Sequence, residues 1–277
     1  MTVPAEPAVH RYGPDPDQFL ELTLPDGRAD DLGPHPVVVV LHGGFWRAAY
    51  GVDLARPLAR SLADDGFAAV AVEYRRVGAG GGWPETLDDV AAAVDALADL
   101  PAARRLDLTG IGTGGIAVVG HSAGGHLAAW TAGRHRLPVG VPGAGPRVRV
   151  GAAVLQSGVV DLELAHEQHL GGDAVSALLG GPPAVVPDRY AVADPVRLLP
   201  TGADLLCVHA AADDDVPLSQ TERYAAAAVV AGDSVEVRVV RGDHMHLIDP
   251  AGDPWHLVRD WLRAHHTGAS HGSTLSP

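Results

Sequence analysis

One serine of the chain stands between two glycines, in the segment Gly-His-Ser-Ala-Gly-Gly at residues 120–125. The segment follows the apolar run 116–119 and leads into an alanine-rich helical pattern. A strand-to-helix turn with this spacing reverses too sharply to leave room for a Cβ beside the serine, which explains the glycines. The helix N-terminus behind the turn supplies unpaired N–H groups and the positive end of the helix dipole. The segment is a weak motif by itself, but it makes Ser122 a candidate nucleophile for attack on a carbonyl carbon.

A serine hydroxyl becomes a nucleophile when a base accepts its proton and a third group holds that base in one tautomer. Downstream, Asp213 follows the apolar strand pattern 205–208, and His244 follows the alternating pattern 235–239. Both side chains therefore fall in loops after strands, at the carboxyl edge where open α/β sheets place their sites. The chain order of serine, aspartate and histidine fits a catalytic triad of Ser122, Asp213 and His244.

Both partners of the serine have rivals close by. Asp213 begins a run of three aspartates, which also suits a solvated turn, but its spacing from the preceding strand and from Val216-Pro217 favours it as the orienting carboxylate. Calcium would need more oxygen ligands than this short run provides. The side chains that remain as alternatives are Asp214, Asp215, His209 and His246.

A second glycine motif lies upstream, where the continuous apolar run 36–41 leads into His-Gly-Gly-Phe-Trp at 42–46. Such a run is typical of a strand inside a parallel sheet. Glycines after the strand let backbone N–H groups turn toward a ligand, as an oxyanion hole requires. We expect the N–H groups of Ala123 and Gly44, with Phe45 as a further donor, to bind an oxyanion.

Taken together, these motifs resemble those of the kynurenine formamidase-like and related esterase/lipase-type α/β-hydrolases. The similar segments are the HGGxW motif at 42–46, the serine turn at 120–128, and residues 157–162, 209–217 and 244–250. The resemblance spans about residues 19–265. It favours His244 over the other histidines, and it implies hydrolysis of an ester or amide by the Ser122–Asp213–His244 triad without a cofactor.

The substrate is less well determined than the chemistry. Many relatives have Phe and Asp after the catalytic histidine, where this chain has Met245 and His246. His42, His121, Glu73 and Asp88 are expected to brace loops, and His121 is also a candidate for substrate contact. The predicted substrate-binding side chains, chosen because they adjoin the motifs, are Phe45, Trp46, His121 and His246.

The rest of the sequence supplies the elements that must position these residues. Strand and helix patterns alternate from residue 36 to residue 265, which predicts a mostly parallel central sheet with helices on both faces. The resemblance implies that this architecture is an α/β-hydrolase fold. Residues 159–200 break the alternation and predict a small cap over the pocket. The predicted organisation is a flexible lead-in at 1–18, one domain at 19–265 and a disordered tail at 266–277.

Composition limits the partners of the chain. Its formal net charge is −14, and an acidic surface argues against nucleic acid and anionic membranes as partners. The single cysteine, Cys207, excludes a disulfide framework, and the chain shows no signal segment and no apolar run of membrane-spanning length. The 15 histidines show no paired metal-ligand spacing, so no metal is expected. These features predict a cytoplasmic protein that acts on a small molecule, with a homodimer left open.

Three functions remain in competition. The first is a carboxylesterase for small or medium acyl esters, and the second is an aryl formamidase of the N-formylkynurenine type. A peptidase is a weaker variant of the enzymatic hypothesis. The third is a non-catalytic binding module on the same fold, which would normally lack a triad member, whereas no member is missing here.

Overall fold

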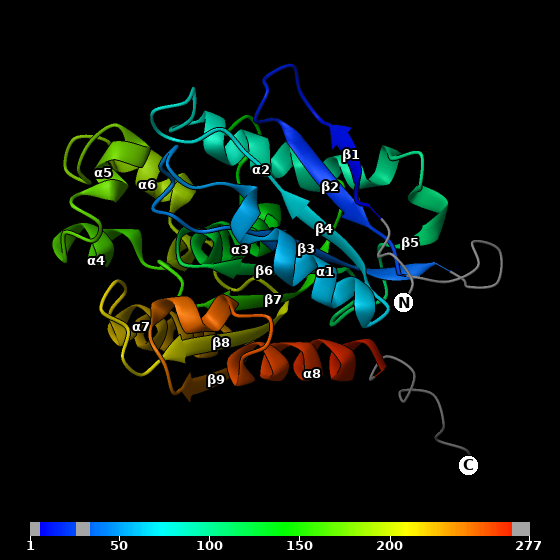
Figure 1. Cartoon of the computed structure of the whole chain (residues 1–277). Coiled ribbons are helices and arrows are strands. Elements are labelled where there is room, and N and C mark those ends of the chain that lie inside the picture. The colour runs from blue at the N-terminus through cyan, green and yellow to red at the C-terminus, as the bar shows by residue number, and fades with distance from the viewer. Residues whose placement is uncertain (1–5, 26–33, 268–277) are drawn as a thin grey trace, which may run out of the picture.

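The computed structural model of the chain describes residues 6–25 and 34–267. Nine strands of these residues form one sheet in the order β1-β2-β4-β3-β6-β7-β8-β9, with β5 beside β3 (Figure 1). The first two strand pairs, β1–β2 and β2–β4, are antiparallel, and all the others are parallel. The strands are β1 (Ala8–Arg11), β2 (Phe19–Thr23), β3 (His35–Leu41), β4 (Ala68–Val72), β5 (Leu106–Asp107), β6 (Ile116–His121), β7 (Val150–Gln156), β8 (Asp204–Ala210) and β9 (Ser234–Val240).

Helices cover both faces of this sheet, so the predicted fold class, an α/β-hydrolase fold, is confirmed. Helices α2, α3 and α7 pack on one face, and α1 and α8 pack on the other. The helices are α1 (Arg56–Asp64), α2 (Glu85–Ala96), α3 (Ala123–Gly133), α4 (Leu162–Glu167), α5 (Ala174–Leu179), α6 (Pro187–Ala193), α7 (Leu218–Ala231) and α8 (Asp253–Thr267).

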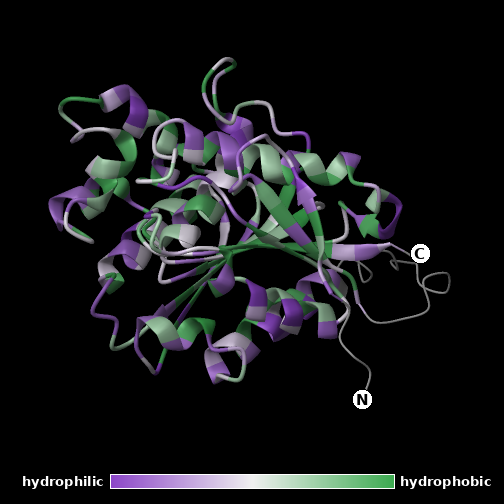
Figure 2. Cartoon of the chain, turned by 45° about the horizontal axis from the view of Figure 1, so that its top comes forward, coloured by the Kyte–Doolittle hydropathy of each residue, from purple (hydrophilic) through white to green (hydrophobic). Residues whose placement is uncertain are grey.

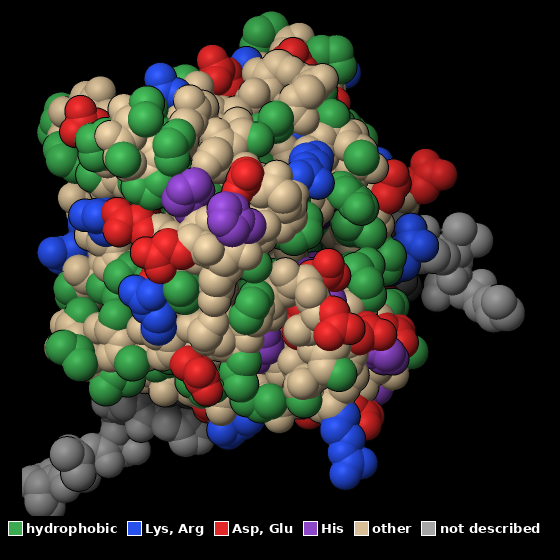
Figure 3. Space-filling view, turned by 90° about the vertical axis from the view of Figure 1, so that its left-hand side faces the viewer, with side chains coloured by type: hydrophobic (Ala, Val, Ile, Leu, Met, Phe, Trp, Pro, Cys, Tyr) green, Lys and Arg blue, Asp and Glu red, His purple; other side chains and the backbone are tan. Residues whose placement is uncertain are grey.

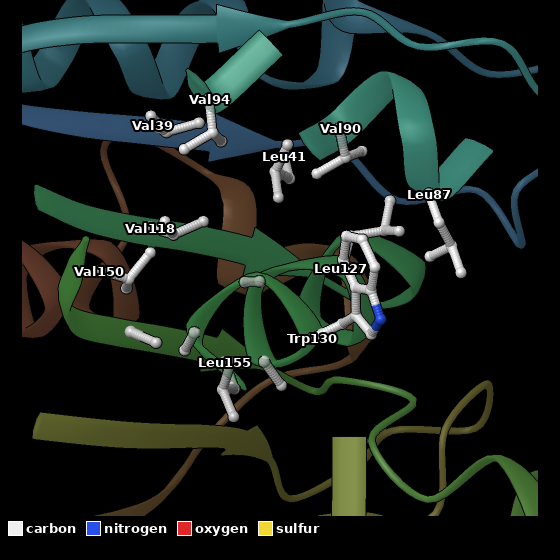
Figure 4. Close-up of a cluster of buried hydrophobic side chains, with 14 of the residues drawn as sticks. Val39, Leu41, Leu87, Val90, Val94, Val118, Leu127, Trp130, Val150 and Leu155 are labelled. Atoms are coloured by element: carbon white, nitrogen blue, oxygen red, sulfur yellow. The ribbon is translucent and has the colours of Figure 1, made fainter. Parts of the chain in front are cut away.

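The central strands are apolar along their whole length because both of their faces are buried. In β3, Val39 and Leu41 face the side of α2 and α3, whereas Val38 and Val40 face α1 and α8. Figure 4 shows the first of these two cores, in which Trp130 of α3 lies among valine and leucine side chains of the sheet and of α2. Figure 2 shows the result as hydrophobic strands inside helices that carry hydrophilic residues outward. The sheet thus gives its carboxyl edge a rigid support.

Residues 159–200 contain α4, α5 and α6, three helices of six or seven residues, which stand beyond the carboxyl ends of the strands in Figure 1. Whether these helices act as a cap over the pocket stays a prediction. The flexible lead-in is wrong for residues 8–11, because β1 pairs in register with β2 at the edge of the sheet. From the predicted tail, residues 266 and 267 belong to α8, and residues 268–277 lie outside the described part of the chain.

Candidate active site

Ser122 occupies the sharp turn between β6 and α3. Its backbone has φ 56° and ψ −120°, a conformation that a non-glycine residue adopts only under tertiary constraint. The flanking glycines have no room for a side chain. A Cβ on Gly120 would lie 1.9 Å from the Gly124 carbonyl oxygen, and one on Gly124 would lie 2.1 Å from the Leu41 carbonyl oxygen. Close packing of this turn therefore fixes the position of Ser122 where β6, α3 and the end of β3 meet.

The glycine motif after β3 lies directly against this turn. A Cβ on Gly43 would come within 2.8 Å of the His121 carbonyl oxygen and 3.0 Å of the Ser122 Cβ. Among the described residues, the backbone N–H groups of Gly44, Phe45 and Ala123 have no protein acceptor. These three N–H groups are therefore free to serve as the predicted oxyanion donors, and that role stays a prediction.

The loop at residues 42–46 is called the oxyanion loop below, after its predicted role. Two of its residues, Phe45 and Trp46, have positive φ values of 50° and 55°. Such strain persists only where neighbouring contacts hold the backbone in place. Trp46 provides one of these contacts, because its indole Nε1–H donates to His126 Nδ1 of α3 at 3.2 Å. The other ring nitrogen of His126 donates to the Ala193 carbonyl oxygen at 2.9 Å. Trp46 is only 1% exposed, so its indole packs in the core beneath the loop, and substrate contact by Trp46 stays a prediction.

His42 and Glu73 brace the same loop from its other end, as predicted. His42 Nε2 lies 2.9 Å from Glu73 Oε1, and its ring stacks on Tyr74. Burial acts to raise the pKa of Glu73, but hydrogen bonds from His42 and from the Val52 and Tyr74 N–H groups outweigh it and hold the pKa below its ordinary value. The ionised carboxylate ties the start of the oxyanion loop to the end of β4.

Asp213 and His244 meet at the carboxyl ends of β8 and β9. His244 Nδ1 lies 2.7 Å from Asp213 Oδ2, and Asp213 Oδ1 accepts the Val216 and Asp215 N–H groups at 2.8 and 3.0 Å. Burial would raise the pKa of Asp213, but hydrogen bonds from His244, Ser157 and the Val216 N–H group hold it well below its ordinary range. The carboxylate is therefore ionised and fixes the proton of neutral His244 on Nδ1, which leaves Nε2 as an acceptor.

The structure separates these two residues from their rivals. Asp214 and Asp215 are exposed, whereas the Asp213 side chain is buried and reaches His244. His209 is buried with both ring nitrogens engaged, by Thr221 Oγ1 at 2.9 Å and the Val216 carbonyl oxygen at 3.0 Å. Asp213 lies 2.7 Å from His244 but 3.9 Å from His209, and the exposed ring of His246 pairs instead with Asp243 at 2.8 Å.

His121 links the base to the serine. It immediately precedes Ser122, and its Nε2–H donates to the His244 carbonyl oxygen at 2.9 Å. The two histidine rings lie 4.3 Å apart between centroids. Burial, followed by the proximity of His244, lowers the pKa of His121 to about 3, so its ring stays neutral. The structure thus gives His121 a bracing contact, as predicted, and substrate contact by its ring stays a prediction.

The cap reaches the site through Gly171. A Cβ there would lie 2.6 Å from the ring of Phe45, and the Arg47 guanidinium donates to the Gly171 carbonyl oxygen. His246 lies on the other side of the site, where its side chain is 60% exposed and its Nδ1 accepts the Asp243 N–H group at 3.2 Å. Figure 3 views this end of the molecule and shows acidic and histidine side chains gathered in its lower right part. Substrate contact by Phe45 and His246 stays a prediction.

Two buried side chains that support the site were not singled out from the sequence. His126 holds Trp46, and its position four residues after Ser122, on the same face of α3, was an available signal. Ser157 follows β7 directly, with φ 42°, and its hydroxyl bonds the Asp213 carboxylate. A polar residue at the carboxyl end of a buried strand is the same signal that identified Asp213.

The described residues contain no group of three or more His, Cys, Asp or Glu side chains placed to hold a metal ion. Cys207 is buried in β8, and burial raises the pKa of its thiol to about 12. No helix in the described ranges is both long enough and apolar enough to cross a membrane.

Comparison with known proteins places this geometry in a family. The model of the BD-FAE family matches residues 20–227, which include Ser122 and Asp213. The chain belongs to the BD-FAE family. No curated protein matches the chain.

Solved structures share the fold. A bifunctional GH43-CE protein of Bacteroides eggerthii is 25% identical, with a TM-score of 0.76 over 92% of this chain and 37% of that one. A thermophilic esterase of Thermogutta terrifontis with bound butyrate is 21% identical, with a TM-score of 0.72 over 98% of this chain and 97% of that one. Esterase B of Lactobacillus rhamnosis is 20% identical, with a TM-score of 0.75 over 98% and 91%. These BD-FAE family and esterase likenesses support a hydrolase of the α/β-hydrolase fold.

Proposed function

We propose that the chain is a serine carboxylesterase that acts on small or medium acyl esters through an acyl-enzyme. The observation that carries the proposal is the bond from His121 to the carbonyl of His244, because it fixes the oriented imidazole next to the residue that precedes Ser122. The ionised Asp213 then leaves His244 Nε2 as the proton acceptor for the serine hydroxyl. The BD-FAE family and the esterases with the same fold support ester hydrolysis as the reaction.

In the proposed mechanism, His244 Nε2 takes the proton of Ser122 while the serine oxygen attacks the ester carbonyl carbon. The negative charge on the carbonyl oxygen is stabilised by the N–H groups of Gly44, Phe45 and Ala123. The tetrahedral intermediate collapses, and His244 gives its proton to the leaving alcohol. Water then loses a proton to His244 and attacks the acyl-enzyme, which releases the acid and restores the serine.

The experiment compares the wild type with Ser122→Ala on p-nitrophenyl acetate, butyrate and octanoate, on an acylated sugar and on N-formylkynurenine. The acylated sugar enters the panel because a carbohydrate esterase from gut microbiota shares the fold. Ser234→Ala, which changes an exposed serine of β9, is the matched control. We expect ester turnover that Ser122→Ala abolishes and Ser234→Ala preserves.

Turnover that survives in a folded Ser122→Ala protein would refute the mechanism. Serine-dependent turnover that is fastest on N-formylkynurenine would replace the esterase by the formamidase suggested by the HGGxW resemblance. Absence of turnover on the whole panel, together with no labelling of Ser122 by a phosphonate probe, would favour the non-catalytic binding module.

A further inference from the structure

Strand β9 ends the sheet on the side opposite β1. It pairs with β8 along its whole length, and within the described ranges no other strand pairs with its outer side. In Figure 1 it lies at the lower edge of the sheet. An unpaired outer edge of seven residues offers a row of free N–H and C=O groups, which proteins usually cover or protect.

Strand β9 and the helix before it carry exposed apolar side chains. Val237 and Val239 of β9 are 40% and 53% exposed, and Val229 and Val230 of the preceding helix α7 are 60% and 89% exposed. These are four of the nine large hydrophobic side chains that are exposed in the described ranges. A free strand edge and a concentration of exposed valines within one strand–helix unit favour a protein partner.

The residues of β9 read as a self-complementary pattern around Val237. The sequence Val-Glu-Val-Arg-Val at 235–239 places Glu236 one residue before this centre and Arg238 one residue after it. Two such strands can pair antiparallel about a two-fold axis that lies between their Val237 residues. Glu236 of each copy then lies opposite Arg238 of the other. Val235 then lies opposite Val239, and the two Val237 side chains are neighbours.

We propose that β9 is the interface of a homodimer, in which two copies pair their β9 strands antiparallel about this axis and join their sheets into one. Glu236 and Arg238 already form an ion pair at 2.7 Å within one strand, on the same face of the sheet. In the dimer the two pairs become a cluster of four alternating charges. Such an interface is isologous and closes as a dimer.

Other registers fit less well. When the axis is perpendicular to the sheet, residues that pair across the interface lie on the same face. The axis must therefore lie midway between the two copies of one residue of β9. An axis through Glu236 would place the two glutamates opposite each other, and one through Arg238 would do the same to the two arginines. Pairing of β9 with β1 of another copy is heterologous and would produce open chains of molecules. The charge pattern therefore favours the register centred on Val237.

Charge reversal tests this register directly. The variants Glu236→Arg and Arg238→Glu each turn both attractive cross-strand pairs into repulsive ones, and we expect each to raise the dimer dissociation constant about tenfold or more. The double variant, which exchanges the two residues, restores attraction in the same register and should dimerise like the wild type. Sedimentation equilibrium from low to high micromolar protein measures all four.

A mixture of the two single variants gives the sharpest outcome. One strand then carries two arginines and the other two glutamates, so the mixture should sediment as a dimer at concentrations where each variant alone is mostly monomeric. Circular dichroism and ester turnover verify that each variant is folded. A monomeric wild type, a wild type that forms open filaments, or single variants that dimerise as well as the wild type would each overturn the proposal.

Discussion

Replacement of Asp213 by asparagine tests the site most severely, because it changes almost no volume. The Asp213 Oδ1 atom accepts two backbone N–H groups, from Val216 and Asp215, whereas Oδ2 accepts His244 Nδ1–H at 2.7 Å. The single oxygen of an asparagine should stay with the two backbone donors. Its amide NH₂ group would then face His244 Nδ1.

This exchange reverses the tautomer of His244. To accept the amide N–H, Nδ1 must give up its proton, which moves to Nε2 and leaves no acceptor for the proton of Ser122. The corresponding change in a serine protease lowers kcat by about 10⁴. We therefore expect kcat/KM to fall by about 10³–10⁴, equivalent to about 4–5.5 kcal/mol of transition-state stabilisation.

The assay is the hydrolysis of p-nitrophenyl butyrate at neutral pH, with circular dichroism to verify the fold. Asp214→Asn and Asp215→Asn are matched controls, because both neighbours are exposed. Both should retain activity within about twofold, as expected for surface changes. If Asp213→Asn keeps more than a tenth of wild-type activity, or if a neighbour proves essential instead, the assignment of the orienting carboxylate is wrong.

Three further predictions concern the supports of the site and the cap. Trp46→Phe removes the hydrogen bond to His126 and should lower kcat about tenfold with little change in KM. Steady-state kinetics on p-nitrophenyl butyrate measure both constants, and a tenfold rise in KM with unchanged kcat would contradict this prediction. Ser157→Ala removes a hydroxyl from Asp213 and should destabilise the fold by about 1–2 kcal/mol in urea unfolding, with a fall in kcat; unchanged unfolding would count against the bond. Burial, with the nearby Asp161, raises the pKa of Asp194 to about 7, so the folded state gains stability from the proton below pH 4 and loses it as pH rises through 7. Asp194→Asn should therefore raise the unfolding temperature more at pH 8 than at pH 5, and an equal change at both would refute this sign.

The sequence was informative wherever one residue type has one physical reason to occur. Continuous valine runs identified the central strand β3, because only strands buried on both faces are apolar throughout. The glycines on either side of Ser122 identified the turn, and the structure shows backbone atoms where their side chains would stand. These features are local, so they can be recognised without the fold.

The remaining features depend on segments that are distant in sequence. Trp46 is the last residue of the oxyanion loop, which suggested substrate contact, but its partner His126 lies on another element and draws the indole into the core. For His121, the sequence could not show the bond to His244 that places it between two loops. β1 was missed because an edge strand of four exposed or half-buried residues has no apolar pattern.

The oxyanion loop is held from below by the Trp46–His126 bond and from above by Gly171 of the cap, which lies against Phe45. In the proposed mechanism these two supports hold the N–H groups of the loop in place before any substrate arrives, and the strain at Phe45 and Trp46 is already met by folding energy. The N–H dipoles of the loop then need no reorganisation when the transition state forms. The same arrangement couples substrate entry to the reaction rate, because a cap that moved far enough to widen the entrance would remove the Gly171 contact that supports the loop. Selection for bulkier substrates in this chain should thus begin in the cap and cost turnover rate.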